Sequence, residues 1–153
     1  MNLVPCATPN FDARPPGSPI LLIVLHADAS PAFSATRSWI ASEKSQVSYH
    51  VEVDRDGTGY RFVEDTERAW AVGKSEWKQF RGLNRISLSA AFANRNDGKE
   101  PLTPLQIAWM VRMIAHWRAR HPLIESVVTH AMVSPGRKFD PIRAPNFRLE
   151  QFA

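Results

Sequence analysis

Continuous apolar runs along the chain predict buried strands, and two of these runs lead to a histidine. Residues 20–25 are entirely aliphatic and are followed by His26. A run of this length without polar alternation is typical of a strand that is covered on both faces. Residues 86–92 form a second candidate strand, and a short run at residues 127–129 leads directly to His130. We therefore expect two histidines at the ends of buried strands.

Two β-rich runs at residues 47–53 and 59–63 predict a hairpin. The five residues between them include the pair Asp56-Gly57. An Asp-Gly pair between two such runs is among the strongest local signals for a tight turn. We expect the two runs to pair with each other in antiparallel fashion.

Amphipathic spacing predicts two helices. The shorter covers residues 34–42, with Trp39 and Ile40 on its apolar side. The longer begins after Thr103, which is a good N-cap, with Pro104 at the first helical position and Gln106 completing a capping box. Apolar residues then recur at helical spacing until His121-Pro122 ends the helix.

The remaining segments carry no regular pattern. Residues 1–19, rich in proline and asparagine, are expected to form an irregular arm, and residues 73–83 and the chain from Ser134 onward read as loops. Strands interleaved with helices indicate an α/β fold with a mixed central sheet flanked by helices. A length of 153 residues suits one domain spanning residues 1–153.

Composition excludes several classes of protein. Cys6 is the only cysteine, so this is no disulfide scaffold, and the 10% aromatic content is too high for a disordered chain. No apolar run approaches the roughly 18 residues that span a bilayer, so we expect no membrane insertion. Residues 1–14 lack the features of a signal peptide, which predicts synthesis in the cytoplasm without a leader. We expect a monomer.

The charge balance favours a polyanionic partner. The formal net charge is +4, which suits nucleic acid, an anionic cell wall or a membrane surface. The densest basic segments, residues 112–120 and 137–138, have neither the aromatic interleaving of an RNA-recognition motif nor a zinc-finger spacing. We therefore expect no nucleic-acid partner.

Three residues are candidates for a metal site. His26 and His130 stand at predicted strand ends, where α/β proteins place functional side chains, and Asp140 follows ten residues after the second histidine. Two imidazoles and one carboxylate would make a three-ligand zinc site with its fourth position open to water. From spacing alone, histidines at strand ends are more often structural residues with satisfied hydrogen bonds than metal ligands.

Four segments of the chain carry a recognisable pattern. They are residues 23–30, residues 48–51 with 54–57, residues 69–73, and residues 129–131 with 134–141. In this order they resemble the first-strand motif, the second strand and hairpin, a segment that lines the substrate groove, and the closing motif of the zinc-dependent N-acetylmuramoyl-L-alanine amidases of type 2. This family includes phage endolysins and shares its fold with the peptidoglycan recognition proteins. The resemblance extends over residues 10–147.

The resemblance implies roles for five residues. The zinc ligands would be His26, His130 and Asp140. Lys138 matches a lysine implicated in catalysis, and Tyr49 matches a tyrosine that several phage members use beside the metal. A fixed ammonium group at Lys138 could stabilise the oxyanion of the attacked amide, and Tyr49 could position water or relay a proton.

The chain departs from the family pattern at two positions. Ala91 stands where many members have a glutamate that is proposed as a catalytic acid–base residue, and Ala71 stands where histidine is frequent. The first departure shifts the expected catalytic work to Tyr49 and Lys138.

The resemblance implies a hydrolase that cleaves the amide bond between the lactyl group of N-acetylmuramic acid and L-alanine in peptidoglycan. The expected setting is a bacteriolytic, antimicrobial phage-type endolysin that acts on the cell wall after holin-dependent release. Two alternatives are a cytoplasmic amidase that recycles muropeptides and a non-catalytic peptidoglycan-binding module on the same fold.

Overall fold

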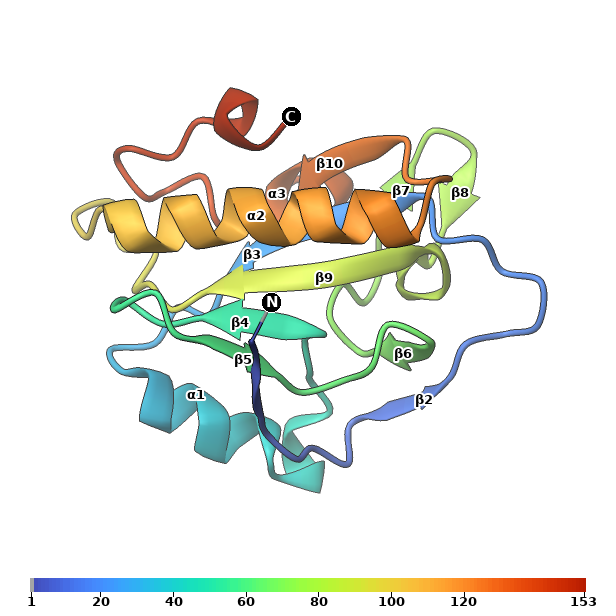
Figure 1. Cartoon of the computed structure of the whole chain (residues 1–153), viewed down its shortest axis with the longest axis horizontal. Coiled ribbons are helices and arrows are strands. Elements are labelled where there is room, and N and C mark those ends of the chain that lie inside the picture. Colours follow the sequence, from blue (N-terminus) through green and yellow to red (C-terminus); the bar gives the residue numbers. More distant parts are fainter. Residues whose placement is uncertain (1) are drawn as a thin grey trace.

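A six-stranded mixed sheet forms the centre of the molecule in the computed structural model, which describes residues 2–153 (Figure 1). Across the sheet the strands are β1 (Val4–Pro5), β5 (Gly59–Arg61), β4 (Val51–Val53), β9 (Ser87–Phe92), β3 (Leu22–Ala27) and β10 (Ser126–Thr129). Within this six-stranded sheet only β4 and β5 pair in antiparallel fashion, and they are the two arms of the predicted hairpin. The mixed sheet and the hairpin are thus confirmed.

The aliphatic run that leads to His26 forms strand β3, which is covered on both faces as predicted. All six residues of β3 are buried, and β3 pairs in parallel with β9 on one side and β10 on the other. Parallel strands buried on both faces tolerate a continuous apolar sequence, which is why no alternation is visible here. In this register His26 lies beside Ala91 of β9.

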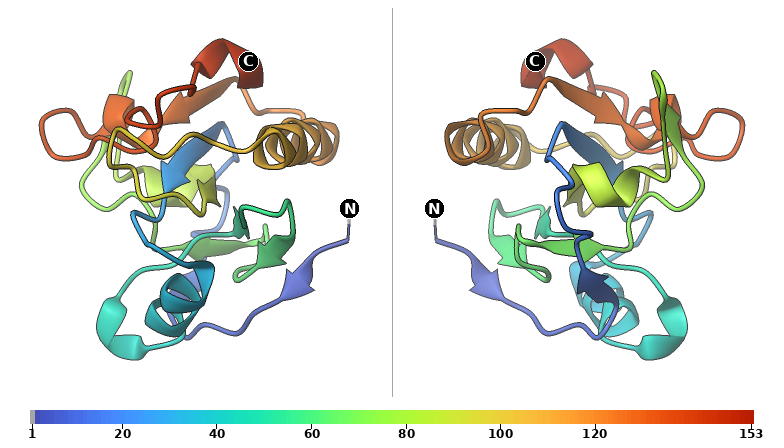
Figure 2. Two further views of the ribbon diagram at one scale, coloured as in Figure 1. Left: turned by 90° about the vertical axis from the view of Figure 1, so that its left-hand side faces the viewer. Right: turned by 90° about the vertical axis from the view of Figure 1, so that its right-hand side faces the viewer.

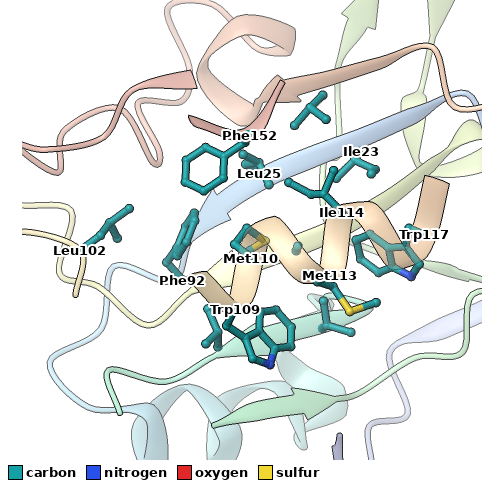
Figure 3. Packing of buried hydrophobic residues seen from close by; sticks show 14 of the residues in the cluster. Ile23, Leu25, Phe92, Leu102, Trp109, Met110, Met113, Ile114, Trp117 and Phe152 are labelled. Atoms are coloured by element: carbon teal, nitrogen blue, oxygen red, sulfur yellow. The ribbon is translucent and has the colours of Figure 1, made fainter. Parts of the chain in front are cut away.

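Helix α2 (Pro104–Arg120) covers one face of the sheet (Figure 1). It starts as predicted, because Thr103 accepts the Gln106 amide N–H at 3.1 Å and the Gln106 side chain accepts the Thr103 N–H at 3.0 Å. Figure 3 shows this packing, in which Ile114 of α2 lies beside the strand residue Ile23, while Met113 extends from the other side of the helix within the same cluster.

One glycine is required by this packing. A Cβ atom at Gly59 would lie 2.3 Å from the ring of Trp109, so only glycine lets β5 pass the indole.

Helix α1 (Phe33–Ile40) packs on the opposite face, so that strands lie between α1 and α2 (Figure 2). Side chains alternate across a strand, and Val51 and Val53 of β4 therefore join the α2 cluster while Glu52 points to the α1 side. No described helix is long and apolar enough to cross a membrane.

The predicted irregular arm is wrong in part. Val4 and Pro5 pair with β5, and β2 (Phe11–Ala13) pairs with β6 (Glu67–Ala69), which the sequence did not indicate. Arg14 anchors the arm, because its guanidinium donates hydrogen bonds to five backbone carbonyls, those of Asp65, Glu67, Asn84, Arg85 and Ser87.

The predicted loops also contain short elements. Within residues 73–83, β7 (Glu76–Trp77) and β8 (Phe80–Arg81) form a small hairpin. The other short elements are the 3₁₀ helices Glu43–Ser45, Leu83–Ile86 and Leu149–Phe152 and the four-residue helix α3 (His130–Val133).

Candidate metal centre

The fold brings the two strand-end histidines to one edge of the sheet. His26 is the fifth residue of β3, and His130 is the first residue of α3, directly after β10. Because β3 and β10 are parallel neighbours, their carboxyl ends meet at the same edge. Asp140 reaches the same place from the following loop, where its carbonyl accepts the Ala131 N–H at 3.1 Å.

Three ligand atoms converge there. The Nδ1 atoms of His26 and His130 are 3.0 Å apart, and Asp140 Oδ2 lies 3.1 Å from His130 Nδ1 and 3.4 Å from His26 Nδ1. Zinc bonds of 2.0–2.1 Å in tetrahedral geometry place ligand atoms about 3.3 Å from one another. The spacing of the three atoms therefore fits one zinc ion.

The hydrogen bonds behind the cluster leave the ligand atoms free. His130 Nε2 lies 3.2 Å from the Val72 carbonyl, to which it donates, so Nδ1 keeps its lone pair for the centre. Arg137 donates to the same carbonyl at 2.7 Å and to the Lys74 carbonyl at 2.7 Å, which ties the closing loop to residues 72–74. Three lone pairs aimed at one point repel one another unless a cation lies between them.

Burial controls the charge of the ligands. His26 is fully buried, which lowers its pKa to about 4, so its imidazole is neutral near pH 7 and able to bind a metal. Burial acts to raise the pKa of Asp140, but the imidazoles of His130 and His26 beside it outweigh burial and keep the pKa below the ordinary range. The cluster thus offers the neutral imidazole of His26 and the carboxylate of Asp140, with the ring of His130 beside them.

Tyr49 and Lys138, the two predicted catalytic residues, lie at the edge of the cluster. The Tyr49 ring is buried, with its centroid 5.2 Å from that of His26. Burial raises the pKa of Tyr49 well above its usual value, so the phenol keeps its proton. Lys138 is partly exposed. Its positive charge also lowers the pKa of His26, but it contributes less than burial and less than the neighbouring residues His130 and Asp140.

Two cavities flank the centre. One of about 500 Å³ is bordered by three basic side chains, Lys74, Arg81 and Arg137, with Ser134 also in its wall. Its only acidic lining residue, Glu76, is paired with Arg81.

The other cavity, of about 320 Å³, lies between the turn after β3 and α1, and Tyr49 borders it. Asp28, Thr36 and the exposed Trp39 line the same cavity. The first cavity is therefore lined mainly by basic side chains, and the second by a carboxyl group and two aromatic side chains.

Sequence reasoning missed one carboxyl group near this site. Glu52 of β4 is fully buried and lies beside Ala91, which in turn lies beside His26. Ala91 itself is buried among apolar side chains. The pattern Val-Glu-Val reads as an ordinary half-exposed strand, so the sequence held no signal for a buried acid.

This donor set lies at the carboxyl edge of a mixed sheet and defines an α/β protein with a candidate mononuclear metal centre. Comparison with protein families then identifies the chain. Residues 16–143 match the model of the N-acetylmuramoyl-L-alanine amidases, and the chain belongs to this family.

Two curated relatives are similar in sequence. N-acetylmuramoyl-L-alanine amidase AmiD of Escherichia coli is 33% identical over 102 residues, covering 61% of this chain and 36% of the relative. The 1,6-anhydro-N-acetylmuramyl-L-alanine amidase AmpD of Haemophilus influenzae is 24% identical over 153 residues, covering 88% of this chain and 82% of the relative. The chain thus spans about a third of AmiD and most of AmpD.

Solved structures agree with this fold. AmiD of E. coli in complex with anhydro-N-acetylmuramic acid-L-Ala-D-gamma-Glu-L-Lys superposes with a TM-score of 0.78 at 28% identity, covering 87% of this chain and 56% of that one. A mutant of PlyL gives a TM-score of 0.68 at 21% identity, covering 94% and 89%, which supports the fold alone.

Proposed function

We propose that this protein is a zinc-dependent amidase that hydrolyses the bond between the lactyl group of N-acetylmuramic acid and L-alanine. The observation that carries the proposal is the convergence of His26, His130 and Asp140, whose ligand atoms lie 3.0–3.4 Å apart in a chain of the amidase family. Zinc, when bound, supplies a Lewis acid that activates water and polarises the amide carbonyl.

The protein's own groups would complete the chemistry. The Lys138 ammonium would stabilise negative charge that develops on the amide oxygen, and the partly enclosed site strengthens that interaction. The neutral phenol of Tyr49, next to His26, would orient the attacking water or the departing amine through its O–H group. Both roles suit the protonated states that burial and exposure give these side chains.

The basic cavity would receive the peptide part of the substrate. A γ-linked D-glutamate, such as the one in the ligand bound to AmiD, keeps a free carboxylate. Lys74, Arg81 and Arg137 line the 500 Å³ cavity and outnumber its single acidic residue. Arginine and lysine side chains are the usual partners of carboxylates, so this cavity is the complementary one.

For the biological setting, we keep the prediction that the protein is an endolysin that acts on the cell wall. A net charge of +4 would favour approach to an anionic wall and predicts weaker binding as salt rises. The similarity to AmpD keeps recycling of soluble muropeptides as the alternative.

The decisive experiment incubates the purified protein with intact sacculi and, separately, with soluble muropeptides, with and without a zinc chelator. Mass spectrometry of the products is expected to reveal stem peptides that begin with L-alanine, released only when zinc is available. Release from sacculi would support the endolysin setting, and release from muropeptides alone would support recycling. Binding to sacculi without any release would contradict the amidase proposal and favour a binding module.

A further inference from the structure

Trp39 is the one exposed tryptophan among the five, all of which lie in residues 2–153. Its exposed fraction is 57%, whereas Trp109 and Trp117 of α2 are buried in the core. Tryptophan gains much from leaving water, because its apolar surface is large. A single exposed apolar residue needs no explanation by itself, but this one borders a cavity.

Helix α1 directs Trp39 toward that cavity. The buried face of the helix consists of Phe33, Thr36 and Ile40. Ala35 and Trp39 are both exposed, and both line the cavity of about 320 Å³, which we call the α1 cavity. Residues four apart lie one above the other on a helix, so the small side chain of Ala35 leaves space beside the indole.

The α1 cavity is a neighbour of the metal centre. Tyr49 borders the cavity, and its ring centroid lies 5.2 Å from that of the ligand His26. Asp28, two residues after His26 in the sequence, lines the same cavity. A substrate whose amide bond lies at the centre therefore has this cavity next to it.

The walls of the α1 cavity suit a neutral ligand with hydroxyl groups. Among the described residues that line it none is basic, Asp28 is the one acid, and the rest are apolar apart from Ser30, Thr36 and Tyr49. The Ser30 hydroxyl donates to the Ala32 carbonyl at 2.9 Å, and the Thr36 hydroxyl donates to Asp28. A hydroxyl that donates inward keeps lone pairs that can accept a hydrogen bond from a ligand.

These walls do not suit the carboxylates of a peptide. The basic cavity with Lys74, Arg81 and Arg137 is the complementary one for those, and the two cavities share no described lining residue. The elements that border them lie apart, with α1 at the lower left of Figure 1 and the β7–β8 hairpin at the upper right. The glycan on the other side of the scissile amide is therefore the better occupant of the α1 cavity.

A sugar ring also matches an indole in shape and charge. The C–H groups on the face of a pyranose ring are weakly positive, and the face of an aromatic ring is negative. The hydroxyl and acetamido groups at the rim of the sugar then form hydrogen bonds with the polar wall. The cavity volume of about 320 Å³ is at the lower end of the range of ligand pockets, about 300–1,000 Å³, and suits one ring.

We propose that the α1 cavity binds one N-acetylated sugar of the peptidoglycan glycan strand, with the sugar ring stacked on Trp39. This inference rests on the proposed amidase function, which gives the peptide part of the substrate to the basic cavity. Trp39 is a binding residue in this proposal, and it does not touch the reacting amide.

The test follows the indole N–H resonance of Trp39 in ¹⁵N-labelled protein, which is assigned by its absence from W39F. One probe is a tetrasaccharide of alternating N-acetylglucosamine and N-acetylmuramic acid, with the lactyl carboxyl groups capped as methylamides so that it is neutral. The other probe is the free peptide L-Ala-γ-D-Glu-L-Lys. Calorimetric titration measures the affinity of the parent, W39A, W39F and L123A for the tetrasaccharide, and thermal denaturation checks the fold of each variant.

L123A is the matched control. Leu123 is a 61% exposed apolar residue in the turn after α2, and it lines neither cavity.

We expect the tetrasaccharide to shift the Trp39 resonance and the peptide to leave it in place. W39A should bind the tetrasaccharide about tenfold or more weakly, and W39F should lose less because phenylalanine keeps an aromatic face. L123A should bind it as the parent does. On a glycan-linked substrate W39A should raise KM more than it lowers kcat, because the contact is made to the sugar and not at the amide.

Four results would overturn the proposal. They are a tetrasaccharide that leaves the Trp39 resonance in place, a peptide that shifts it, a parent-like affinity in folded W39A, and a resonance that moves with protein concentration alone. The last would mean that a second copy of the chain covers Trp39. A parent that binds the tetrasaccharide through Trp39 but hydrolyses no peptidoglycan would refute the amidase proposal alone, and hydrolysis with an unmoved Trp39 resonance would refute the glycan site alone.

Discussion

The buried histidine His50 should make this protein sensitive to acid. Its Nδ1 accepts the Ser89 N–H at 3.0 Å, and its Nε2 lies 3.2 Å from the Glu67 carbonyl. Burial, followed by the positive charge of Arg14, lowers the pKa of His50 from 6.5 to about 3. The native ring therefore stays neutral at pH values where the unfolded chain has bound a proton.

The size of the effect follows from proton linkage. Above pH 6.5 both states are neutral at this residue, and stability is lost as the pH falls from 6.5 toward 3 because only the unfolded state takes up a proton. Each pH unit in this window contributes ~1.4 kcal/mol. Between pH 7.5 and pH 5, His50 alone should lower the free energy of unfolding by ~2 kcal/mol.

Urea unfolding of the metal-free parent and of H50Q at several pH values measures this contribution. Glutamine can accept the Ser89 N–H and donate to Glu67, but it does not titrate. We expect the parent to lose ~2 kcal/mol more than H50Q between pH 7.5 and 5. H116Q, at a partly exposed position of α2, is the control; burial also lowers the pKa of His116, but less than that of His50, so its curve should lie closer to the parent than to H50Q. Parallel curves for parent and H50Q would refute the reasoning.

Three further predictions concern the site and the core. In H130A, with two donors left, zinc content measured by elemental mass spectrometry should fall well below one ion per chain, and the amidase activity should fall with it. K138A should keep its zinc and its KM but lose kcat by roughly 10²-fold, and a parent-like kcat would remove Lys138 from the reaction. G59A places a Cβ 2.3 Å from the Trp109 ring. This clash should reduce stability by about 1–3 kcal/mol in thermal denaturation followed by circular dichroism, and an unchanged melting temperature would contradict the described packing.

The elements that could be predicted are those whose signals are local. The start of α2 is encoded by Thr103, Pro104 and Gln106, within four residues, and the β4–β5 hairpin by one Asp-Gly pair. The pairing of β2 with β6 joins segments more than fifty residues apart, and it depends on long-range anchors such as Arg14 that no local pattern encodes. The β7–β8 hairpin turns through Lys78 with a positive φ of 51°, so its turn lacks the usual glycine or asparagine.

In the candidate site, too, local sequence signals predict some residues and not others. His26 and His130 could be placed at strand ends from hydrophobic runs, whereas Asp140 lies in a loop and was connected to them by its spacing from His130 and by the family resemblance. Glu52 was beyond sequence reasoning for a different reason. Alternation along β4 correctly predicts that Glu52 and its valine neighbours point to opposite faces of the sheet. Whether the face with Glu52 meets solvent depends on tertiary packing, because α1 covers it.

The short strand β1 also matters for the solubility of the molecule. It occupies the outer edge of the sheet beside β5, and Pro5 in that strand has no N–H to offer a further strand. An exposed edge with free N–H and C=O groups is a template for intermolecular pairing, and a proline-containing cap blocks it. Variants that detach the first residues from β5 would uncover this edge, and they should self-associate at protein concentrations where the intact chain stays dispersed.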